Sequence, residues 1–356
     1  MEIGSEFWFD KIPVKEDKEI KVPDFFSFGE DNRLLFLGRT ALDAALADIM
    51  KNRTVRVVYC PSYCCQSMLE PFISRNIKIR YYSVNLKNNK ISINVDTRMG
   101  CDVFLAVNYF GFGCSEMTSY IEAFRRRGTA VIEDITHNLL STKAYCKDSD
   151  YLIAGLRKWG SMVGGGLLCK MHGKFSEDLK FVPPDVSLVR TRLSAMVAKG
   201  HYMRNPSSKV KSFYTSQYWH FNSAIIKNYA NYTTDLYSAR IINNMNIELM
   251  RSRRLSNVKV LYSELSDTAH LKLIGSLSEG DCPLYVPVSV DPELRTGLRE
   301  SLKGQEIFLP IHWDKPNEEC VSNLYDTELS LVCDQRYEPV HIRNMAYAVK
   351  KYLNSI

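Results

Sequence analysis

The chain has 356 residues, of which 45% are hydrophobic and 24% are charged. These values are ordinary for a folded enzyme, and the length suits two closely associated domains better than a single core. The net charge of +6 is small, and the arginine clusters at 125–127 and 251–254 are expected on helix faces that meet solvent or a second subunit. They therefore do not indicate a nucleic-acid-binding protein.

Signals for export and for membrane insertion are absent from the sequence. The first eight residues lack a basic region that leads into an apolar stretch, so we expect no signal peptide. No window of about 18 residues is uninterruptedly apolar, which argues against a membrane span. The ten cysteines lie mostly in apolar strands, as Cys60, Cys101 and Cys169 do, which is typical of free thiols in a reducing compartment. We expect a cytoplasmic protein without disulfides.

The predicted elements begin after an N-terminal arm, residues 1–33, which is interrupted by prolines and which we expect to pack on the body. Its aromatic anchors are Phe7, Trp8, Phe9, Phe25 and Phe26. The following helices are predicted at 40–51, 67–75 and 115–127, and the strands at 55–60, 77–84, 103–107, 130–134 and 151–156. Strands that alternate with helices of this length predict a mostly parallel sheet with helices on both faces.

The second half of the chain has a different character. Residues 184–265 are mainly polar and helical. After them, strands are predicted at 284–290, 307–309 and 329–332, and helices at 292–302 and 340–353. We expect a large α/β domain at 34–235 and a smaller α+β domain at 236–356.

Two strand ends carry the groups that one cofactor requires. Lys158 follows an apolar strand and precedes the glycines at 164–166, and Asp134 ends the strand at 130–134. Ligands of such sheets bind beyond the carboxyl ends of the strands, where both side chains would lie. Burial and the neighbouring Arg157 would lower the pKa of the lysine and so favour its nucleophilic form. A lysine that forms a Schiff base and an acid that keeps a ring nitrogen protonated are what pyridoxal phosphate needs; the alternative is a surface lysine that happens to follow a strand.

Two shorter motifs allow the same interpretation and a simpler one. Gly38, Arg39 and Thr40 open a helix whose free N–H groups suit a phosphate, although an ordinary N-cap has the same sequence. Tyr63 and Cys65 lie in a strand-to-helix loop that could border a cofactor ring. The nearby cysteines lack a fourth ligand, so we expect no metal site.

Two further positions follow strand ends. Asn108 precedes a glycine-containing turn and could line the pocket, or the segment could be only a tight turn. His137 could orient Asp134 or contact the phenolic oxygen of the cofactor, while a helix-capping acid and a structural histidine are the alternatives. Neither of the glycine motifs typical of nucleoside triphosphate and dinucleotide sites is present.

Together these residues resemble the DegT/DnrJ/EryC1/StrS family, the sugar aminotransferases of pyridoxal phosphate fold type I, over most of the chain. The resemblance implies that the backbone amides of Arg39 and Thr40 hold the phosphate, that Asp134 faces the ring nitrogen and that Lys158 carries the cofactor. It places Tyr63 in the loop whose aromatic residue stacks on the ring.

At other positions the match is looser. Asn108 stands where the family usually has histidine, and His137 where it has glutamine or histidine. Ile153 replaces a phosphate-binding serine, so Arg157 could take over that role. Cys65 stands where an aromatic residue is expected, and Met162 and Val163 replace the usual Gly-Glu pair. The retained lysine argues against the family's dehydratases, which carry histidine there.

The resemblance implies a homodimeric fold type I aminotransferase whose active site lies at the subunit interface. The small-molecule partners would be an amino acid donor, with glutamate as a candidate, and a keto acceptor, expected to be a nucleotide-linked sugar. His312, Trp313 and Arg336 are candidates for the substrate side, although Arg336 could instead form a structural ion pair. Two alternatives stay open: a non-catalytic or regulatory relative, and a pyridoxal phosphate enzyme of another reaction type.

Overall fold

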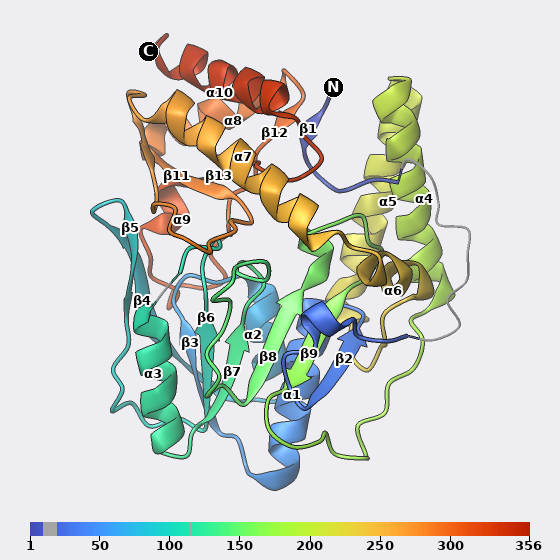
Figure 1. Cartoon of the computed structure of the whole chain (residues 1–356), viewed down its shortest axis with the longest axis vertical. Coiled ribbons are helices and arrows are strands. Elements are labelled where there is room, and N and C mark those ends of the chain that lie inside the picture. Colours follow the sequence, from blue (N-terminus) through green and yellow to red (C-terminus); the bar gives the residue numbers. More distant parts are fainter. Residues whose placement is uncertain (10–19, 114) are drawn as a thin grey trace.

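Two β-sheets organise the molecule, and the larger one positions the candidate site (Figure 1). The structure is a computed structural model, and it describes residues 1–9, 20–113 and 115–356. Part of the predicted N-terminal arm, residues 10–19, therefore lies outside the described residues, as does Cys114.

The larger sheet is mostly parallel, as predicted. Its strands, in spatial order, are β2 (Asp31–Leu35), β9 (Gly166–Lys170), β8 (Tyr151–Gly155), β7 (Ala130–Asp134), β6 (Val103–Val107), β3 (Val57–Pro61), β4 (Lys78–Lys87) and β5 (Lys90–Asn94). The strands from β8 to β4 are parallel, whereas β2, β9 and β5 pair antiparallel at the two edges. The carboxyl ends of the parallel strands consequently meet at one edge of the sheet.

The first three helices pack on this sheet, and the next four follow it in the chain. The sheet-packing helices are α1 (Gly38–Asn52), α2 (Gln66–Ile73) and α3 (Ser115–Arg126). They are followed by α4 (Val186–Arg204), α5 (Ser208–Lys227), α6 (Leu236–Asn243) and α7 (Ile247–Leu265). Helices α4 and α5 form a long hairpin that stands beside the body (Figure 1). The predicted helical character of residues 184–265 is confirmed.

The smaller sheet contains β10 (Leu271–Leu273), β11 (Val286–Val290) and β13 (Glu328–Leu331). Around it lie α7, α8 (Pro292–Lys303), α9 (Leu324–Thr327) and α10 (Pro339–Leu353). The remaining short elements are β1 (Ile3–Gly4), which pairs in parallel with β12 (Ile307–Phe308), and the 3-10 turns Asp24–Phe26 and Leu156–Lys158. The start of the chain is thus part of the same region as its end.

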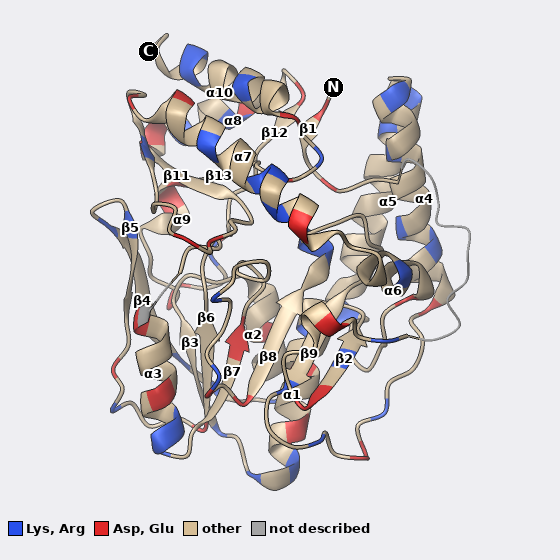
Figure 2. Ribbon diagram, in the orientation of Figure 1, with Lys and Arg blue, Asp and Glu red and all other residues tan. Residues whose placement is uncertain are grey.

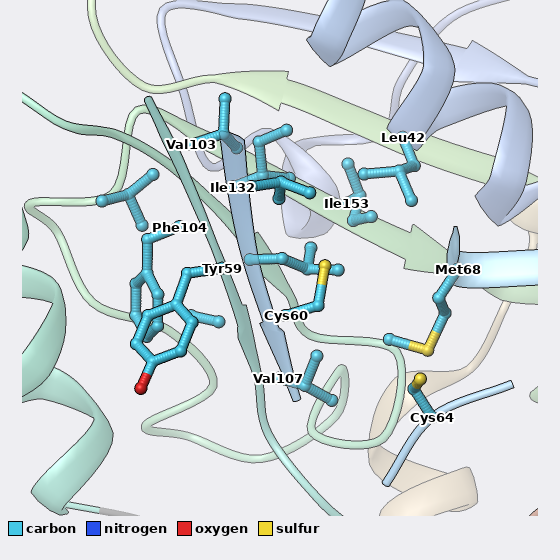
Figure 3. Close-up of a cluster of buried hydrophobic side chains, with 14 of the residues drawn as sticks. Leu42, Tyr59, Cys60, Cys64, Met68, Val103, Phe104, Val107, Ile132 and Ile153 are labelled. Atoms are coloured by element: carbon cyan, nitrogen blue, oxygen red, sulfur yellow. The ribbon is translucent and has the colours of Figure 1, made fainter. Parts of the chain in front are cut away.

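The sequences of the central strands are continuous apolar runs, and their position in the core explains this. All five residues of β6 are buried, because a strand in the middle of a covered parallel sheet is enclosed on both faces. Figure 3 shows side chains of adjacent strands, among them Cys60, Val103 and Ile132, packed together with Leu42 of α1. The bounds predicted for β6 and β7 are those observed.

Several sequence expectations need correction. Arg254, expected on a helix face, is fully buried and donates hydrogen bonds to the Pro283 and Leu284 carbonyl oxygens. Cys101 lies in the loop before β6 rather than in a strand. Strands β2, β5 and β10 were not predicted, because polar residues interrupt or dominate them.

Other expectations agree with the structure. The nine described cysteines are free thiols. Basic and acidic residues are distributed over both parts of the molecule (Figure 2). Within the described residues, no helix has the length and apolar character that crossing a membrane requires.

Asp48 ties α1 to the strands beside the candidate site. Its fully buried carboxylate accepts hydrogen bonds from Lys170 Nζ and Tyr151 Oη, both at 2.7 Å, and from the Ser176 N–H at 2.9 Å. Burial alone would raise its pKa, but these donors outweigh burial and lower it. Because Tyr151 begins β8 and Lys170 ends β9, this one carboxylate fixes the helix against both strands.

We expect Asp48→Ala to lower the free energy of unfolding by about 3–5 kcal/mol, because it leaves the Lys170 ammonium without its buried partner. Urea unfolding of the purified variant measures this loss. The control is Asp178→Ala, which removes an exposed partner of Lys51, also on α1, and should cost less than about 1 kcal/mol. Equal losses in the two variants would contradict the role given to Asp48.

Candidate active site

Lys158 lies just beyond the carboxyl end of β8, at the wall of a cavity of about 150 Å³. The cavity brings together most of the predicted site residues. Those that line it are Arg39, Cys65, Asn108, Asp134, His137, Arg157, Lys158 and Trp313. The prediction that Asp134 and Lys158 meet at one edge of the sheet is therefore confirmed.

The turn that carries Lys158 is fixed by its neighbours. Trp159 is fully buried and donates a hydrogen bond from Nε1 to the Thr136 carbonyl oxygen at 2.7 Å. The Thr136 hydroxyl accepts from the Gly155 N–H at 2.9 Å, which ties β8 to the loop after β7. Gly166 lies against the start of α1, where an added Cβ would come within 2.1 Å of the Leu37 carbonyl oxygen. Glycine is thus required where β9 passes the helix.

The Lys158 amine contacts a histidine whose tautomer is determined by a backbone bond. The Phe110 N–H donates to His137 Nδ1 at 3.0 Å, so Nδ1 is the acceptor and the proton of the neutral ring is on Nε2. Burial, then the charge of Lys158, lowers the His137 pKa well below its ordinary value and keeps the ring neutral. His137 Nε2 lies 3.5 Å from Lys158 Nζ. An Nε2–H can donate to a neutral amine but not to an ammonium.

Burial lowers the pKa of Lys158 as well, and Arg157 adds to this effect, while Cys65 and Asp134 oppose it. The Trp313 ring covers the amine, with Nζ 5.8 Å from the ring centre, and stacks on His137 at 5.8 Å and 25°. The lowered pKa and the Nε2–H that faces the amine both favour the neutral, nucleophilic form of this lysine.

Asp134 and Glu133 end β7 with opposite orientations. Asp134 faces the cavity, and its Oδ1 accepts from the Thr136 N–H at 2.8 Å. Glu133 is buried behind it and accepts from Asn108 Nδ2 at 2.7 Å, Ser149 Oγ at 2.6 Å and the Cys146 N–H at 3.0 Å. Glu133 therefore orients the amide of Asn108, a cavity residue.

Two arginines in the cavity wall have nitrogens without partners. Arg157 Nη1 and Arg39 Nε are buried, and no hydrogen-bond acceptor among the described residues reaches either atom. Burial, then Arg192, lowers the pKa of Arg157 to about 10. Both guanidinium groups lie beside the first turn of α1, whose N–H groups also lack intrahelical acceptors. Together these donors form a site for an anion.

Four predicted site residues do not line this cavity. Thr40 is buried, with its hydroxyl bonded to the Leu37 N–H and the Tyr229 carbonyl oxygen. Tyr63 is buried behind Trp313, 5.1 Å between ring centres, and donates to Glu328 Oε2. His312 is buried, with Nδ1 2.9 Å from Ser330 Oγ.

Arg336 forms the structural ion pair that was its alternative. Its Nε and Nη2 bind the two carboxylate oxygens of Asp334 at 2.9 and 2.7 Å, and its guanidinium stacks on Phe7 at 3.9 Å. Sequence reasoning missed the contributions of Ser67, Thr136 and Ile225 to the cavity wall. Ile225 comes from α5, and no pattern in the sequence links that helix to Lys158.

No family model and no curated protein matches the sequence. Solved structures match its fold. The chain is similar to Helicobacter pylori PseC, an aminotransferase involved in the biosynthesis of pseudoaminic acid, at 11% identity and a TM-score of 0.68, covering 100% of both chains. It is similar to DesV of S. venezuelae at 14% identity and a TM-score of 0.63, covering 93% of this chain and 87% of that one.

A DegT DnrJ EryC1 StrS aminotransferase from Brucella abortus is also similar, at 15% identity and a TM-score of 0.60, with 91% of this chain and 86% of that one covered. These likenesses show that the chain has the fold of pyridoxal phosphate fold type I aminotransferases. The fold class predicted from the sequence is confirmed.

The environment of Glu133 predicts a pH-dependent stability. Burial raises its pKa to about 7, although its three hydrogen-bond donors oppose the shift. A carboxyl that stays protonated in the folded state contributes stability at low pH, and this is lost as pH rises through the folded pKa. The difference in unfolding free energy between the wild type and Glu133→Gln should therefore fall by about 2 kcal/mol from pH 5 to pH 8.

Urea unfolding at several pH values measures this difference. Glu116→Gln, on the exposed surface of α3, is the matched control for the substitution itself. A Glu133→Gln difference that does not change with pH would refute the raised pKa.

Proposed function

We propose that the protein is a pyridoxal phosphate-dependent aminotransferase that moves an amino group from an amino acid to a keto group of a sugar. In the overall reaction the donor becomes a 2-oxo acid and the acceptor carbonyl becomes an amine, so atoms balance without a further reactant. The observation that carries the proposal is the Lys158 amine, 3.5 Å from His137 Nε2, in a cavity that Asp134 also lines. The printed names of the structural neighbours, among them a putative sugar aminotransferase in its PLP form, support the substrate class.

The residues of the cavity fit this cofactor. The unpartnered Arg157 Nη1 and Arg39 Nε, with the first turn of α1, would hold its phosphate. Ile153 stands where the family has a phosphate-binding serine, and Arg157 would bind the phosphate in place of that serine. Asp134 would hold the ring nitrogen, and Asn108, oriented by Glu133, would contact the ring substituents. When bound, the cofactor supplies an aldehyde that accepts amino groups and a ring that withdraws electrons.

Lys158 then serves as the proton carrier. With the cofactor and the donor bound, Lys158 Nζ would take a proton from the α-carbon of the donor and deliver it back to the bound molecule. The His137 Nε2–H orients the amine, and Trp313 excludes water from it. Cys65 replaces an aromatic side chain, so Trp313 would contribute the aromatic surface of this site.

The other predicted residues receive supporting roles in the proposal. Thr40 fixes the start of α1, while Tyr63 and His312 support Trp313 and its loop through Glu328 and Ser330. Glutamate is the proposed donor, because the resemblance implies it.

We further propose a cytoplasmic homodimer with domains at 34–235 and 236–356 after the arm at 1–33. The exposed apolar side chains of Phe213, Trp219 and Ile226 on α5, the helix that also brings Ile225 to the cavity, support a subunit interface there. The free cysteines support a reducing compartment.

The decisive test adds pyridoxal phosphate to the purified protein, followed by borohydride and peptide mapping. We expect a visible absorbance band that shifts when an amino acid is added, and a label on the Lys158 peptide alone. Lys158→Ala should abolish both the band and the label, while its fold, monitored by circular dichroism, persists. A label on another lysine, or no band in the wild type, would overturn the proposal.

Pyridoxal without its phosphate is the matched control ligand. The wild type should bind pyridoxal phosphate at least tenfold more tightly than pyridoxal, and Arg157→Met should lose most of this preference because it removes the unpartnered guanidinium. An unchanged preference in Arg157→Met would place the phosphate elsewhere.

A further inference from the structure

A second cavity, of about 400 Å³, shares Arg157 and Lys158 with the first. The Lys158 amine therefore stands between two spaces, one at the carboxyl ends of the strands and one on the side of the smaller sheet. The other walls of the second cavity come from the N-terminal residues 4–7, from Tyr285, from residues 308–310, from Val332 and from Arg336. Of the three residues that the sequence suggests for the substrate side, Arg336 lines this cavity, whereas His312 and Trp313 do not.

The N-terminal wall is held in place from two sides. Strand β1 pairs with β12, and Figure 1 shows the chain running from there toward α4 and α5. The Glu6 carbonyl oxygen accepts from Lys199 Nζ of α4 at 2.7 Å and from Arg336 Nη1 at 3.2 Å. Gly4 has a φ of +83°, and an added Cβ would lie 2.0 Å from the Phe308 carbonyl oxygen. Residues 4–7 are thus held in a fixed position at the wall of the cavity.

Glu6 presents a carboxylate to this cavity. Its Oε2 accepts from Arg192 Nη2 at 2.8 Å, while no described residue donates to Oε1, and a third of the side chain is exposed (34%). Burial would raise its pKa, but the charges of Arg192 and Arg157 lower it to about 2. Glu6 therefore has an ionised carboxylate with one oxygen that no described residue occupies, and it lines the same cavity as Arg157 and Lys158.

Apart from Arg157 and Lys158, which the cofactor would engage, the walls of this cavity suit a hydroxylated ring better than a carboxylate. The donors of Arg336 are taken by Asp334 and by the Ser5 and Glu6 carbonyl oxygens, so this cation has none to spare for an acid. The Tyr285 hydroxyl has no hydrogen-bond partner among the described residues and can donate or accept. The apolar surface of Phe308, Leu309, Pro310 and Val332 suits the C–H face of a sugar ring.

We propose that the second cavity binds the hydroxylated ring of the amino acceptor, and that Glu6 is its specificity-determining residue, with Oε1 accepting a ring hydroxyl. This inference rests on the proposed aminotransferase activity and adds the place and chemistry of the acceptor. The N-terminal segment, far from Lys158 in the sequence, is then part of the substrate site.

The test follows the reverse half-reaction of the holoenzyme in single-turnover experiments. The probes are UDP-linked 3-amino-3-deoxyglucose and 4-amino-4-deoxyglucose, compared with l-glutamate. In each case the probe's amino group moves to the cofactor, and the probe leaves as a ketone or 2-oxo acid whose oxygen comes from water. The visible band of the holoenzyme decays as this happens, so the half-saturating concentration of each probe can be measured.

Glu6→Gln keeps an oxygen for Arg192 but removes the charge of the free acceptor. We expect the half-saturating concentration of the reactive amino sugar to rise about tenfold, while that of l-glutamate changes less than about twofold. Tyr285→Phe leaves Glu6 and its partners intact. It should also raise the half-saturating concentration of the amino sugar. Glu306→Gln removes a carboxylate that binds Tyr202 and Lys211 outside the cavity and should change neither value.

The inference would be overturned if Glu6→Gln raised the half-saturating concentrations of the amino sugar and of l-glutamate equally. It would also be overturned if neither Glu6→Gln nor Tyr285→Phe changed the value for the amino sugar. A wild type that reacts with l-glutamate but with neither amino sugar would overturn it as well. In that case the visible band and the labelled Lys158 would still support the proposed function, so the two failures are distinguishable.

Discussion

The whole site depends on one contact, in which the half-buried Lys158 amine faces the Nε2–H of His137. The Phe110 N–H occupies the other ring nitrogen and so leaves the proton on the side of the lysine. Protonating the amine would set an ammonium against this N–H and beside Arg157, in a half-buried position. The backbone N–H after β6 thereby acts on a lysine after β8, through the histidine in the loop after β7.

Around this contact, the structure keeps polar groups unsatisfied at the places where a ligand would use them. Buried polar atoms are normally hydrogen-bonded, and leaving one unpaired costs about 1–3 kcal/mol. Arg157 Nη1 and Arg39 Nε are such atoms, and both lie by the first turn of α1. Arg336, in contrast, has a full set of partners and stabilises the N-terminal wall. Arg336 is therefore a structural residue of this wall, whereas Arg157 and Arg39 each keep a donor that a ligand in the first cavity could use.

The sequence predicts the fold class and the centre of the site because both depend on local patterns. The apolar runs of β6 and β7 and the residues that follow strands, Asp134 and Lys158, are visible in the chain itself. The polar edge strand β5 is not, since its place depends on pairing with β4. The wall formed by Glu6 depends on tertiary contacts with Arg192 and Arg336, which no spacing reveals.

The most direct test of the account is the titration of the Lys158 amine in the protein without cofactor. Competitive labelling with trace acetic anhydride across a pH series, read by peptide mass spectrometry, gives the pKa of each reactive lysine. The account predicts that the reactivity of Lys158 reaches half its maximum at a lower pH than that of the exposed lysines. A Lys158 profile that coincides with theirs would contradict the claim that the surroundings of this amine lower its pKa.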